Sequence, residues 1–522
     1  MVRKISLLSV TIFFVSGNIA QGFQSDNALS TKPVKVEGGL VSGHKNKRTG
    51  VAVYRGIPFA APPVGDLRWK APYPVIPWKG VKACEEFGPS PMQPKPVSFL
   101  MIGPEFVVPA QPLSEDCLYL NIWTAAKSPL EKRPVMVWIY GGGFTTGGSA
   151  APGYSGEVMA AQGIVFVSFN YRLGIFGFLS HPELTAESNH HSSGNYGLMD
   201  QIAALRWVQK NICAFGGDPD RVTIAGQSAG SASVNCLVAS PLARGLFHGA
   251  IGESGSLVLE NPILHMRSLS DAENEGVRIA SKLNVKDIQS LRALTADDLQ
   301  KKAGGFFAPI TDGYVMPLSV AETFNKNMQT HVPLLTGWNG DEGLIFGIST
   351  KEDFAKQASS FGADSDLFKK YFPSRTDSES IASQIALAVD KTIGLSQYEW
   401  AVQQNQNNNT KTFLYLFTRK PPAEGEKKRF GAYHTAEIGY ALHNLDSIQR
   451  AWEQADRRLE KLVSAYWVQF VKTGDPNQPG QPAWGAFSRI NPQSMIFGDS
   501  CLAMPLPNMD ALEFLNTRYP RK

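Results

Sequence analysis

Apolar residues in this chain gather in short runs that are bounded by turn-forming residues. Five runs have the length and composition of buried strands: LYLNIWTA from Leu118, PVMVWIYGGG from Pro134, IVFVSFNYR from Ile164, RVTIAGQ from Arg221 and VPLLTGW from Val332. Near-continuous apolar runs of this kind are typical of strands that are covered on both faces. They predict a sheet whose strands are mostly parallel.

Helical spacing appears between some of these runs. The segment DQIAALRWVQKNI starts at Asp200, and its apolar residues recur every three or four positions: Ile202, Leu205, Val208 and Ile212. This spacing gives a helix with one apolar face. Asp200 stands at the predicted start of the helix, where the helix dipole favours a carboxylate. Strands that alternate with such helices predict an α/β fold, with a large, mostly parallel central sheet and helices on both faces.

Two segments fit neither pattern. The stretch between Cys84 and Cys117 is rich in proline, which is excluded from helix interiors and from central strands, so we expect a surface loop there. The tract QQNQNNNT from Gln403 is polar and of low complexity, so we expect it to avoid burial. This tract also contains a glycosylation sequon at Asn408.

The first residues have the composition of an export signal. Arg3 and Lys4 precede an apolar run from Ile5 to Val15, and small residues follow up to Ala20. The run is shorter than the ~20 apolar residues that a membrane span needs. We therefore predict a signal peptide over residues 1–23 and an exported protein, either secreted or periplasmic. No comparable run follows, so we expect no stable membrane insertion.

Charge and cysteine usage exclude several classes of partner. Removing Arg3 and Lys4 from a net charge of +4 leaves about +2, which is too little to attract nucleic acid or anionic lipid. The chain has 5 cysteines but no CxxC or HExxH motif, so nothing supports a zinc or redox centre. We expect a small-molecule partner and no metal or organic cofactor. The sequence leaves the oligomeric state open.

A serine between glycines directly follows the apolar run from Arg221. In VTIAGQSAG, Ser228 stands between a strand pattern and the small-residue helical pattern SAGSASVNCLVAS. Gly226 and Gly230 suit a sharp strand-to-helix turn, where a Cβ would collide with neighbouring elements. Such a turn lifts the serine hydroxyl clear of the backbone, at the N-terminus of a helix. A helix-capping serine is the alternative, and the context favours a nucleophile.

A serine nucleophile needs a base that takes its proton. In a nucleophile-elbow fold the order along the chain is serine, acid, histidine, so the base is expected after Ser228. His248 stands just before the next predicted strand, and His443 falls on a helical pattern. In KKRFGAYHTAEIGYAL, His434 stands in a loop just before a helix. This position favours His434.

The acid of such a triad is expected at the end of an intervening strand, where its carboxylate can receive the imidazole N–H. Asp341 and Glu342 follow the apolar strand in VPLLTGWNGDEGLIF. Asp312, in APITDGYVMP, is a third candidate. Side-chain chemistry does not separate these three carboxylates.

Three glycines end the run that starts at Pro134. Gly141, Gly142 and Gly143 carry no Cβ, so their backbone N–H groups can approach a ligand oxygen. Their position after a core strand, upstream of a nucleophile elbow, favours an oxyanion hole over a plain glycine turn. Loss of one such donor typically costs ~3 kcal/mol of transition-state stabilisation.

Five separated motifs occur along the chain: SEDCLYLNIW, GGGF, GQSAG, GWNGDEG and AYHTAEI. With these motifs, in this order, the chain closely resembles the type-B carboxylesterase and cholinesterase family of α/β-hydrolases, from about Val34 to the C-terminus. The resemblance implies one α/β-hydrolase domain over residues 24–522, with loop and helical excursions around an active-site gorge. It also implies hydrolysis of carboxylic esters through an acyl-enzyme, without a cofactor.

The same resemblance implies a role for each site residue. The implied roles are Ser228 as nucleophile, Glu342 as acid, His434 as base, and the N–H groups of Gly142, Gly143 and Ala229 as the oxyanion hole. It implies two structural ion pairs, of Arg68 with Glu115 and of Arg172 with Asp200. Finally, it implies a disulfide between Cys84 and Cys117, which would close the proline-rich loop.

Two departures from the family pattern narrow the range of esters that we expect as substrates. Gln227 precedes the nucleophile, where cholinesterases and many relatives carry a glutamate, so one attraction for a cation is lost. The segment from Cys84 to Cys117 contains no tryptophan, whereas cholinesterases place a choline-binding indole there. We predict a preference for neutral esters over choline esters. A lipase-like esterase for longer acyl chains and a catalytically inactive binding protein of the same family are the alternatives.

Overall fold

The computed structural model describes residues 28–95, 97–98, 101, 103–106, 112–260, 265–343, 347–406 and 410–518. The predicted signal peptide and the sequon at Asn408 lie outside the described residues. Among the residues described, no helix combines the length and the apolar character that a membrane crossing requires. The same residues contain no cluster of three or more His, Cys, Asp or Glu side chains that could hold a metal ion.

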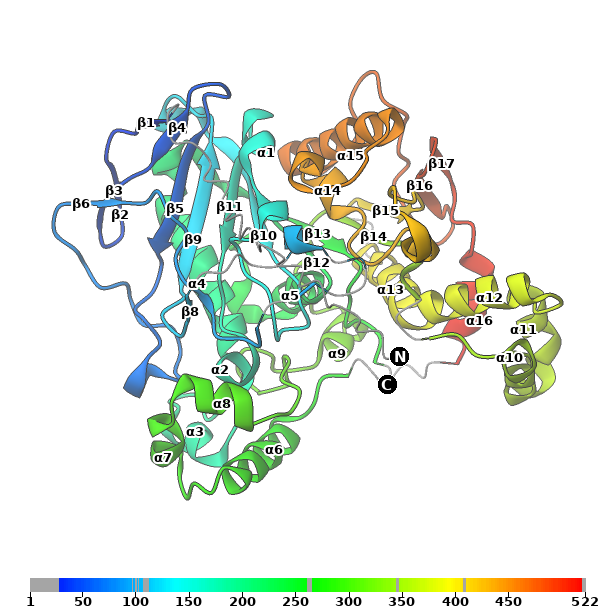
Figure 1. Ribbon diagram of the computed structural model, residues 1–522, viewed down its shortest axis with the longest axis horizontal. Helices are drawn as coiled ribbons and strands as arrows, with labels where there is room; N and C mark the ends of the chain where they lie inside the picture. Colours follow the sequence, from blue (N-terminus) through cyan, green and yellow to red (C-terminus); the bar gives the residue numbers. More distant parts are fainter. Residues whose placement is uncertain are drawn as a thin grey trace, which may run out of the picture.

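A 12-stranded sheet forms the centre of the molecule (Figure 1). From one edge to the other its strands are β1 (Ala28–Ser30), β4 (His44–Asn46), β5 (Ala52–Pro58), β9 (Tyr119–Thr124), β11 (Val165–Phe169), β10 (Arg133–Ile139), β12 (Gly217–Gln227), β13 (Gly249–Glu253), β14 (Leu334–Asn339), β15 (Thr412–Phe417), β16 (Gln493–Phe497) and β17 (Cys501–Pro505). Neighbouring strands from β11 to β16 in this order are parallel, and antiparallel pairs lie at both edges. The predicted large, mostly parallel sheet is confirmed.

Two small sheets lie outside this central one. One contains β2 (Val34–Val36), β3 (Gly39–Ser42) and β6 (Val81–Ala83), and the other contains β7 (Ser90–Pro91) and β8 (Leu113–Ser114). The proline-rich segment therefore contributes strands of only two residues in its described part, and none of them joins the central sheet. This agrees with the exclusion of proline from central strands.

Helices cover both faces of the sheet and extend beyond its two ends. They are α1 (Glu157–Ala161), α2 (Gly174–Phe178), α3 (Pro182–Glu187), α4 (Tyr196–Asn211), α5 (Ala229–Ala239), α6 (Leu269–Lys282), α7 (Ile288–Ala293), α8 (Ala296–Lys302), α9 (Val320–Asn325), α10 (Lys351–Gln357), α11 (Ser365–Tyr371), α12 (Asp377–Val389), α13 (Leu395–Gln404), α14 (Ile438–Ala441), α15 (Gln454–Thr473) and α16 (Met509–Asn516). In Figure 1, α1 and α15 lie on one side of the sheet, and α4, α5 and α13 lie on the other. Helices α10–α12 form one end of the molecule, at the right of the view, and helices α6–α8 lie together at its lower edge.

The five apolar runs all form strands of the central sheet, namely β9, β10, β11, β12 and β14. In β10 every residue from Pro134 to Ile139 is buried, because helices pack on both sides of this strand. A strand that is covered on one face alternates apolar and polar residues, whereas a strand covered on both faces is apolar throughout. The continuous apolar pattern is therefore explained.

Helix α4 begins at Tyr196, earlier than the sequence pattern predicts. Asp200 consequently lies inside the helix, and the prediction that it stands at the N-terminus is wrong. Its carboxylate is fully buried and accepts hydrogen bonds from Arg172 Nε at 2.8 Å and Arg172 Nη2 at 2.7 Å. The predicted ion pair of Arg172 with Asp200 is therefore present. The predicted pair of Arg68 with Glu115 is present too, with Arg68 Nε 2.6 Å from Glu115 Oε1. Both pairs join segments that are distant in sequence.

The predicted Cys84–Cys117 disulfide is absent from the structure. Both cysteines are buried free thiols, and burial raises the pKa of the Cys84 thiol to about 11. The carbonyl of Cys84 accepts the N–H of Arg55 in β5 at 2.7 Å. Cys117 instead lines a small cavity together with Pro91 and Met92.

The prediction that the tract from Gln403 avoids burial is wrong for its first two residues. Gln403 and Gln404 form the last turn of α13, and each is 1% exposed. The Nε2 group of Gln404 donates to the carbonyls of Thr330 and Val332 at 3.0 and 3.1 Å. The buried amide nitrogen is therefore satisfied by the chain that leads into β14, a partner that composition does not reveal.

Candidate active site

Ser228 lies at the turn from β12 to α5, with φ 59° and ψ −125°. This conformation is strained for a residue with a side chain, and such strain is typical of nucleophile elbows. The Ser228 N–H donates to the carbonyl of Glu253 at 2.8 Å, and the Ser228 carbonyl accepts the N–H of Ala232 at 2.9 Å. The backbone on both sides of the serine is thus fixed, which sets the direction of its hydroxyl.

The two glycines around the elbow allow β10 to pass close to the turn. A Cβ on Gly230 would lie 2.0 Å from the carbonyl oxygen of Ile139, and one on Gly226 would lie 2.7 Å from the same atom. Both distances are too short for a carbon atom, and the atom met is backbone that cannot move aside. The predicted steric role of both glycines is therefore confirmed.

Three side chains that are distant in sequence form one hydrogen-bonded chain. His434 Nε2 lies 2.9 Å from Ser228 Oγ, and His434 Nδ1 contacts Glu342 Oε2. The Glu342 side chain is fully buried, while that of His434 is 21% exposed. The residues that the family resemblance assigns to nucleophile, acid and base thus meet in the order that proton transfer from the serine requires.

The Glu342 carboxylate is oriented by two hydrogen bonds that sequence reasoning does not find. Its Oε1 atom accepts the Asn339 N–H at 2.9 Å and the Ser254 hydroxyl at 3.1 Å. With Oε1 held in this way, Oε2 faces the imidazole. Ser254 follows β13 and has φ 51°. The motif GESGS, a glycine-flanked serine just after an apolar strand, is a signal that could have identified it.

The other candidate acids have structural partners. The Asp341 carboxylate accepts the N–H of Ala432 at 2.8 Å and so holds the loop that leads to the histidine. The Asp312 carboxylate accepts the N–H of Met316 at 2.7 Å and stabilises its own turn. Of the three carboxylates that chemistry could not separate, only Glu342 contacts the imidazole of the triad.

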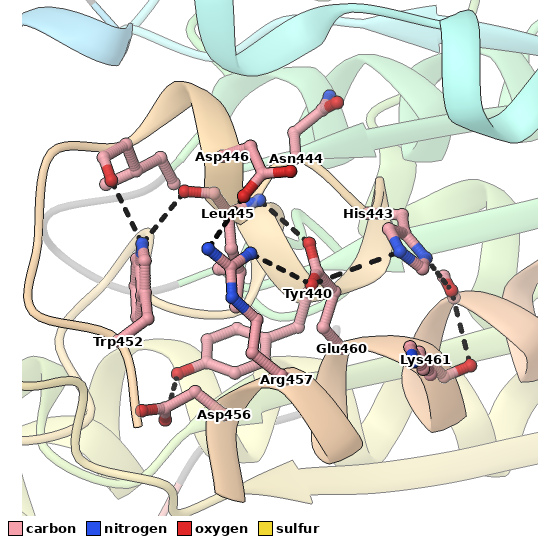
Figure 2. Close-up of polar contacts among 12 residues, drawn as sticks. Tyr440, His443, Asn444, Leu445, Asp446, Trp452, Asp456, Arg457, Glu460 and Lys461 are labelled. Carbon is pink, nitrogen blue, oxygen red and sulfur yellow. Dashed lines mark hydrogen bonds and ion pairs between the residues drawn. The ribbon is translucent and has the colours of Figure 1, made fainter. Parts of the chain in front are cut away.

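The two alternative histidines lie elsewhere. The backbone N–H of Val222 donates to His248 Nδ1 at 3.4 Å, well before the end of β12 that carries the nucleophile. Figure 2 shows His443 directed toward Glu460 on α15. Its Nδ1 atom lies 2.9 Å from the hydroxyl of Ser464, and its Nε2 atom lies 4.0 Å from Glu460. His443 therefore connects the end of α14 to α15.

The glycine loop after β10 lies against the nucleophile. A Cβ on Gly141 would be 3.0 Å from the Cβ of Ser228, so the two segments are in direct contact. Gly142 has φ 115° and Gly143 has φ 63°, a backbone region that favours glycine. Within the described part of the chain, the N–H groups of Gly142, Gly143 and Ala229 donate to no protein atom. They remain available to a ligand oxygen.

Two further carboxyl groups are buried behind the triad. Burial raises the pKa of Glu253 to about 8, and Trp467 Nε1 donates to its Oε1 atom at 2.8 Å. Burial, together with the nearby charges of Glu253 and Glu342, raises the pKa of Glu437 well above its ordinary value. Asn339 Nδ2 donates to Glu437. With a pKa of about 8, Glu253 is mainly protonated at neutral pH.

Gln227 holds the backbone of the triad histidine. Its side chain is 2% exposed, and its Nε2 group donates to the carbonyl of His434. The position that carries a glutamate in cholinesterases thus holds an uncharged amide here. This amide donates its hydrogen bond to the backbone of His434.

A mostly parallel sheet, a serine on a strand-to-helix turn and a Ser–His–Glu chain define an α/β-hydrolase. The chain belongs to the carboxylesterase family, whose model matches residues 30–502. It is 36% identical over 480 residues to the fumonisin B1 esterase of Sphingopyxis macrogoltabida, covering 86% of this chain and 83% of that protein. It is 32% identical over 484 residues to the para-nitrobenzyl esterase of Bacillus subtilis (strain 168), covering 89% and 94%.

The fold comparison agrees with this family. A solved structure of a PNB esterase superposes with a TM-score of 0.78 at 30% identity, covering 92% of this chain and 99% of that one. The protein is accordingly a serine hydrolase that acts on carboxylic esters.

Proposed function

We propose that this protein hydrolyses neutral carboxylic esters through an acyl-enzyme formed on Ser228, with His434 as base and Glu342 as acid. The observation that carries the proposal is the unbroken hydrogen-bonded chain from the serine hydroxyl through both imidazole nitrogens to a buried carboxylate. We assign the oxyanion hole to the N–H groups of Gly142, Gly143 and Ala229, because no atom of the described residues accepts from these donors and they border the nucleophile.

Acylation begins when His434 Nε2 accepts the hydroxyl proton of Ser228 while Oγ attacks the ester carbonyl carbon. Negative charge then develops on the former carbonyl oxygen, and backbone N–H groups stabilise it in the transition state. The imidazolium that forms is stabilised through Nδ1 by the Glu342 carboxylate. His434 next donates its proton to the departing alcohol.

Deacylation repeats these steps with water as the nucleophile. His434 accepts a proton from the water molecule, which attacks the acyl-enzyme, and then returns a proton to Ser228 Oγ. Every proton transfer in the cycle therefore goes to or from the side chain of His434. Each half-reaction starts from the neutral imidazole, because a protonated imidazole cannot accept a proton.

We infer the preference for neutral esters from two positions that lack the groups with which cholinesterases attract a cation. The Gln227 amide is uncharged and bonded to the His434 carbonyl, so it supplies no negative charge beside the nucleophile. The segment from Cys84 to Cys117 offers no indole. A quaternary ammonium group would lose its hydration without gaining the cation–π contact that normally replaces it.

We also propose that the protein is exported, on the basis of residues 1–23. Fractionation of expressing cells, followed by mass spectrometry of the N-terminus, tests this. A chain processed near Ala20 in the periplasm or the medium is expected. A full-length chain that stays in the cytoplasm contradicts the proposal.

The acyl-enzyme is tested with a fluorescent fluorophosphonate and with rapid mixing. We expect stoichiometric labelling that maps to the peptide containing Ser228, and a burst of p-nitrophenol from p-nitrophenyl butyrate before steady turnover. A folded protein that takes up no label is the inactive binding protein instead. A sharp rise in rate when a long-chain ester exceeds its solubility favours the lipase-like esterase.

A further inference from the structure

One buried amide clamps the loop that carries the oxyanion-hole glycines. Gln93 Nε2 donates to the Gly147 carbonyl at 2.7 Å, and the Gly147 N–H donates to Gln93 Oε1 at 2.9 Å. Gln93 is 2% exposed and lies in the proline-rich segment, 54 positions before Gly147. Its side chain therefore satisfies both backbone polar groups of one residue, as a neighbouring strand would.

Gly147 closes a tight turn that begins at Gly142. The N–H groups of Thr145 and Thr146 donate to the Gly142 carbonyl at 3.1 and 3.0 Å. A Cβ on Gly147 would lie 2.6 Å from the carbonyl oxygen of Gly141, so the two ends of the turn are in contact. A shift of Gly147 is consequently transmitted to the start of the turn.

The turn also fixes the direction of one oxyanion donor. The carbonyl of Gly142 and the N–H of Gly143 belong to one planar trans peptide group, so they point in opposite directions. Because the Gly142 carbonyl is held inside the turn, the Gly143 N–H is directed out of it.

A second amide anchors the loop farther along. Asn170 Oδ1 accepts the N–H and the hydroxyl of Ser149, both at 2.9 Å, and Asn170 Nδ2 donates to the Pro89 carbonyl at 3.1 Å. This anchor holds the loop beyond the turn, whereas Gln93 holds the residue that closes it.

We infer that Gln93 is a positioning residue for the oxyanion hole, since its two hydrogen bonds to Gly147 fix the peptide that presents the Gly143 N–H. The inference rests on the oxyanion hole assigned above, and it gives the proline-rich segment a role in the reaction. Without the clamp the turn can rotate, and the donor then misses the oxygen on which charge develops. Such a loss appears in the transition state and not in substrate binding.

Gln93→Met, which keeps the length of the side chain but removes both hydrogen bonds to Gly147 and a third one to the Pro91 carbonyl, tests the inference. We expect kcat to fall by roughly tenfold to a hundredfold, with KM changed by about twofold at most. Affinity for a trifluoromethyl ketone, which forms a tetrahedral oxyanion on the serine, should fall by a similar factor. Affinity for a planar, non-reacting competitive inhibitor should stay as in the wild type.

Gln209→Met is the matched control. Gln209 Nε2 donates to the carbonyls of Pro219 and Leu246 at 2.8 and 3.0 Å, at a site remote from the glycine loop. This variant should retain wild-type kcat and ketone affinity. If Gln93→Met behaves like Gln209→Met in both measurements, the inference is wrong. Substantial hydrolysis by Ser228→Ala would instead overturn the proposed nucleophile, so the two failures are distinguishable.

A second variant covers the case in which Gln93→Met does not fold. Gln93→Asn keeps the amide but shortens its reach, so the same loss of kcat and ketone affinity is expected at a melting temperature near that of the wild type. Wild-type kcat in this variant would also overturn the inference.

Discussion

His434 Nε2 lies 2.9 Å from Ser228 Oγ, although 206 positions of sequence separate the two residues. The contact depends on the order of the strands. Ser228 follows β12 and Glu342 follows β14, and these parallel strands are separated only by β13. Parallel strands bring their carboxyl ends to one edge of a sheet, so the chemistry gathers where the strands end.

Replacement of the triad acid should impair catalysis far more than replacement of its neighbour. Glu342→Gln removes the negative charge that stabilises the imidazolium and favours the wrong tautomer, so we expect kcat to fall by about 10⁴-fold. Asp341→Asn is the matched control, because its amide oxygen can still accept the Ala432 N–H. It should retain most of the activity. Steady-state kinetics that rank the two variants in the opposite order would exclude Glu342 as the acid.

The buried carboxyl of Glu253 should make the protein less stable as the pH rises. Its pKa is about 8 in the folded protein, against an ordinary value of 4.5. Between these values the folded state binds more protons than the unfolded state, so the free energy of unfolding falls with increasing pH. The slope from this group approaches about 1.4 kcal/mol per pH unit.

Glu253→Gln should flatten that dependence, because the amide does not titrate. Urea denaturation of both proteins between pH 5 and pH 9 measures the effect, with the exposed Glu424→Gln as control. Glu437, whose pKa is also raised, should leave a residual slope of the same sign. Parallel curves for the wild type and Glu253→Gln would show that Glu253 is not the group responsible.

Gly230→Ala should destabilise the protein strongly. The added Cβ would lie 2.0 Å from the backbone oxygen of Ile139, and relieving this contact requires β10 and the elbow to separate. We expect a loss of about 3 kcal/mol or more, measured by chemical denaturation. At Gly245 a Cβ would meet no atom within 4 Å, and φ is +81°, so Gly245→Ala should cost only about 1 kcal/mol of backbone strain. Equal losses for the two variants would contradict a steric role at Gly230.

The preference for neutral esters is measured with an isosteric pair of substrates. Butyrylcholine and 3,3-dimethylbutyl butyrate share an acyl group and differ in the charge of the alcohol. Because position 227 carries no charge and the segment from Cys84 to Cys117 carries no tryptophan, kcat/KM for butyrylcholine should be about tenfold lower or worse. Equal values for the two esters would refute the preference.

Local sequence patterns predict the sheet and the nucleophile well. The apolar strands are continuous because both faces are covered, and Ser228 is marked by a strand, small residues and two sterically required glycines. These signals work because each depends on residues that are close together in the chain. The same holds for the glycine loop after β10.

Features that depend on a distant partner could not be predicted in this way. Asp341 and Glu342 are adjacent and chemically alike, and only the folded loop decides which one reaches the imidazole. The Cys84–Cys117 disulfide, which only the family resemblance implies, is absent from the structure. The role of Gln93 has no local signal, since its partner lies in another loop.

The most direct test of the nucleophile is the kcat/KM of Ser228→Ala on p-nitrophenyl butyrate, with the melting temperature confirming that the variant is folded. Loss of the attacking hydroxyl should lower kcat/KM by about 10⁵-fold or more, to the level that binding and the oxyanion donors alone provide. A folded variant with activity near that of the wild type would contradict the assignment of Ser228 as the residue that carries the acyl group.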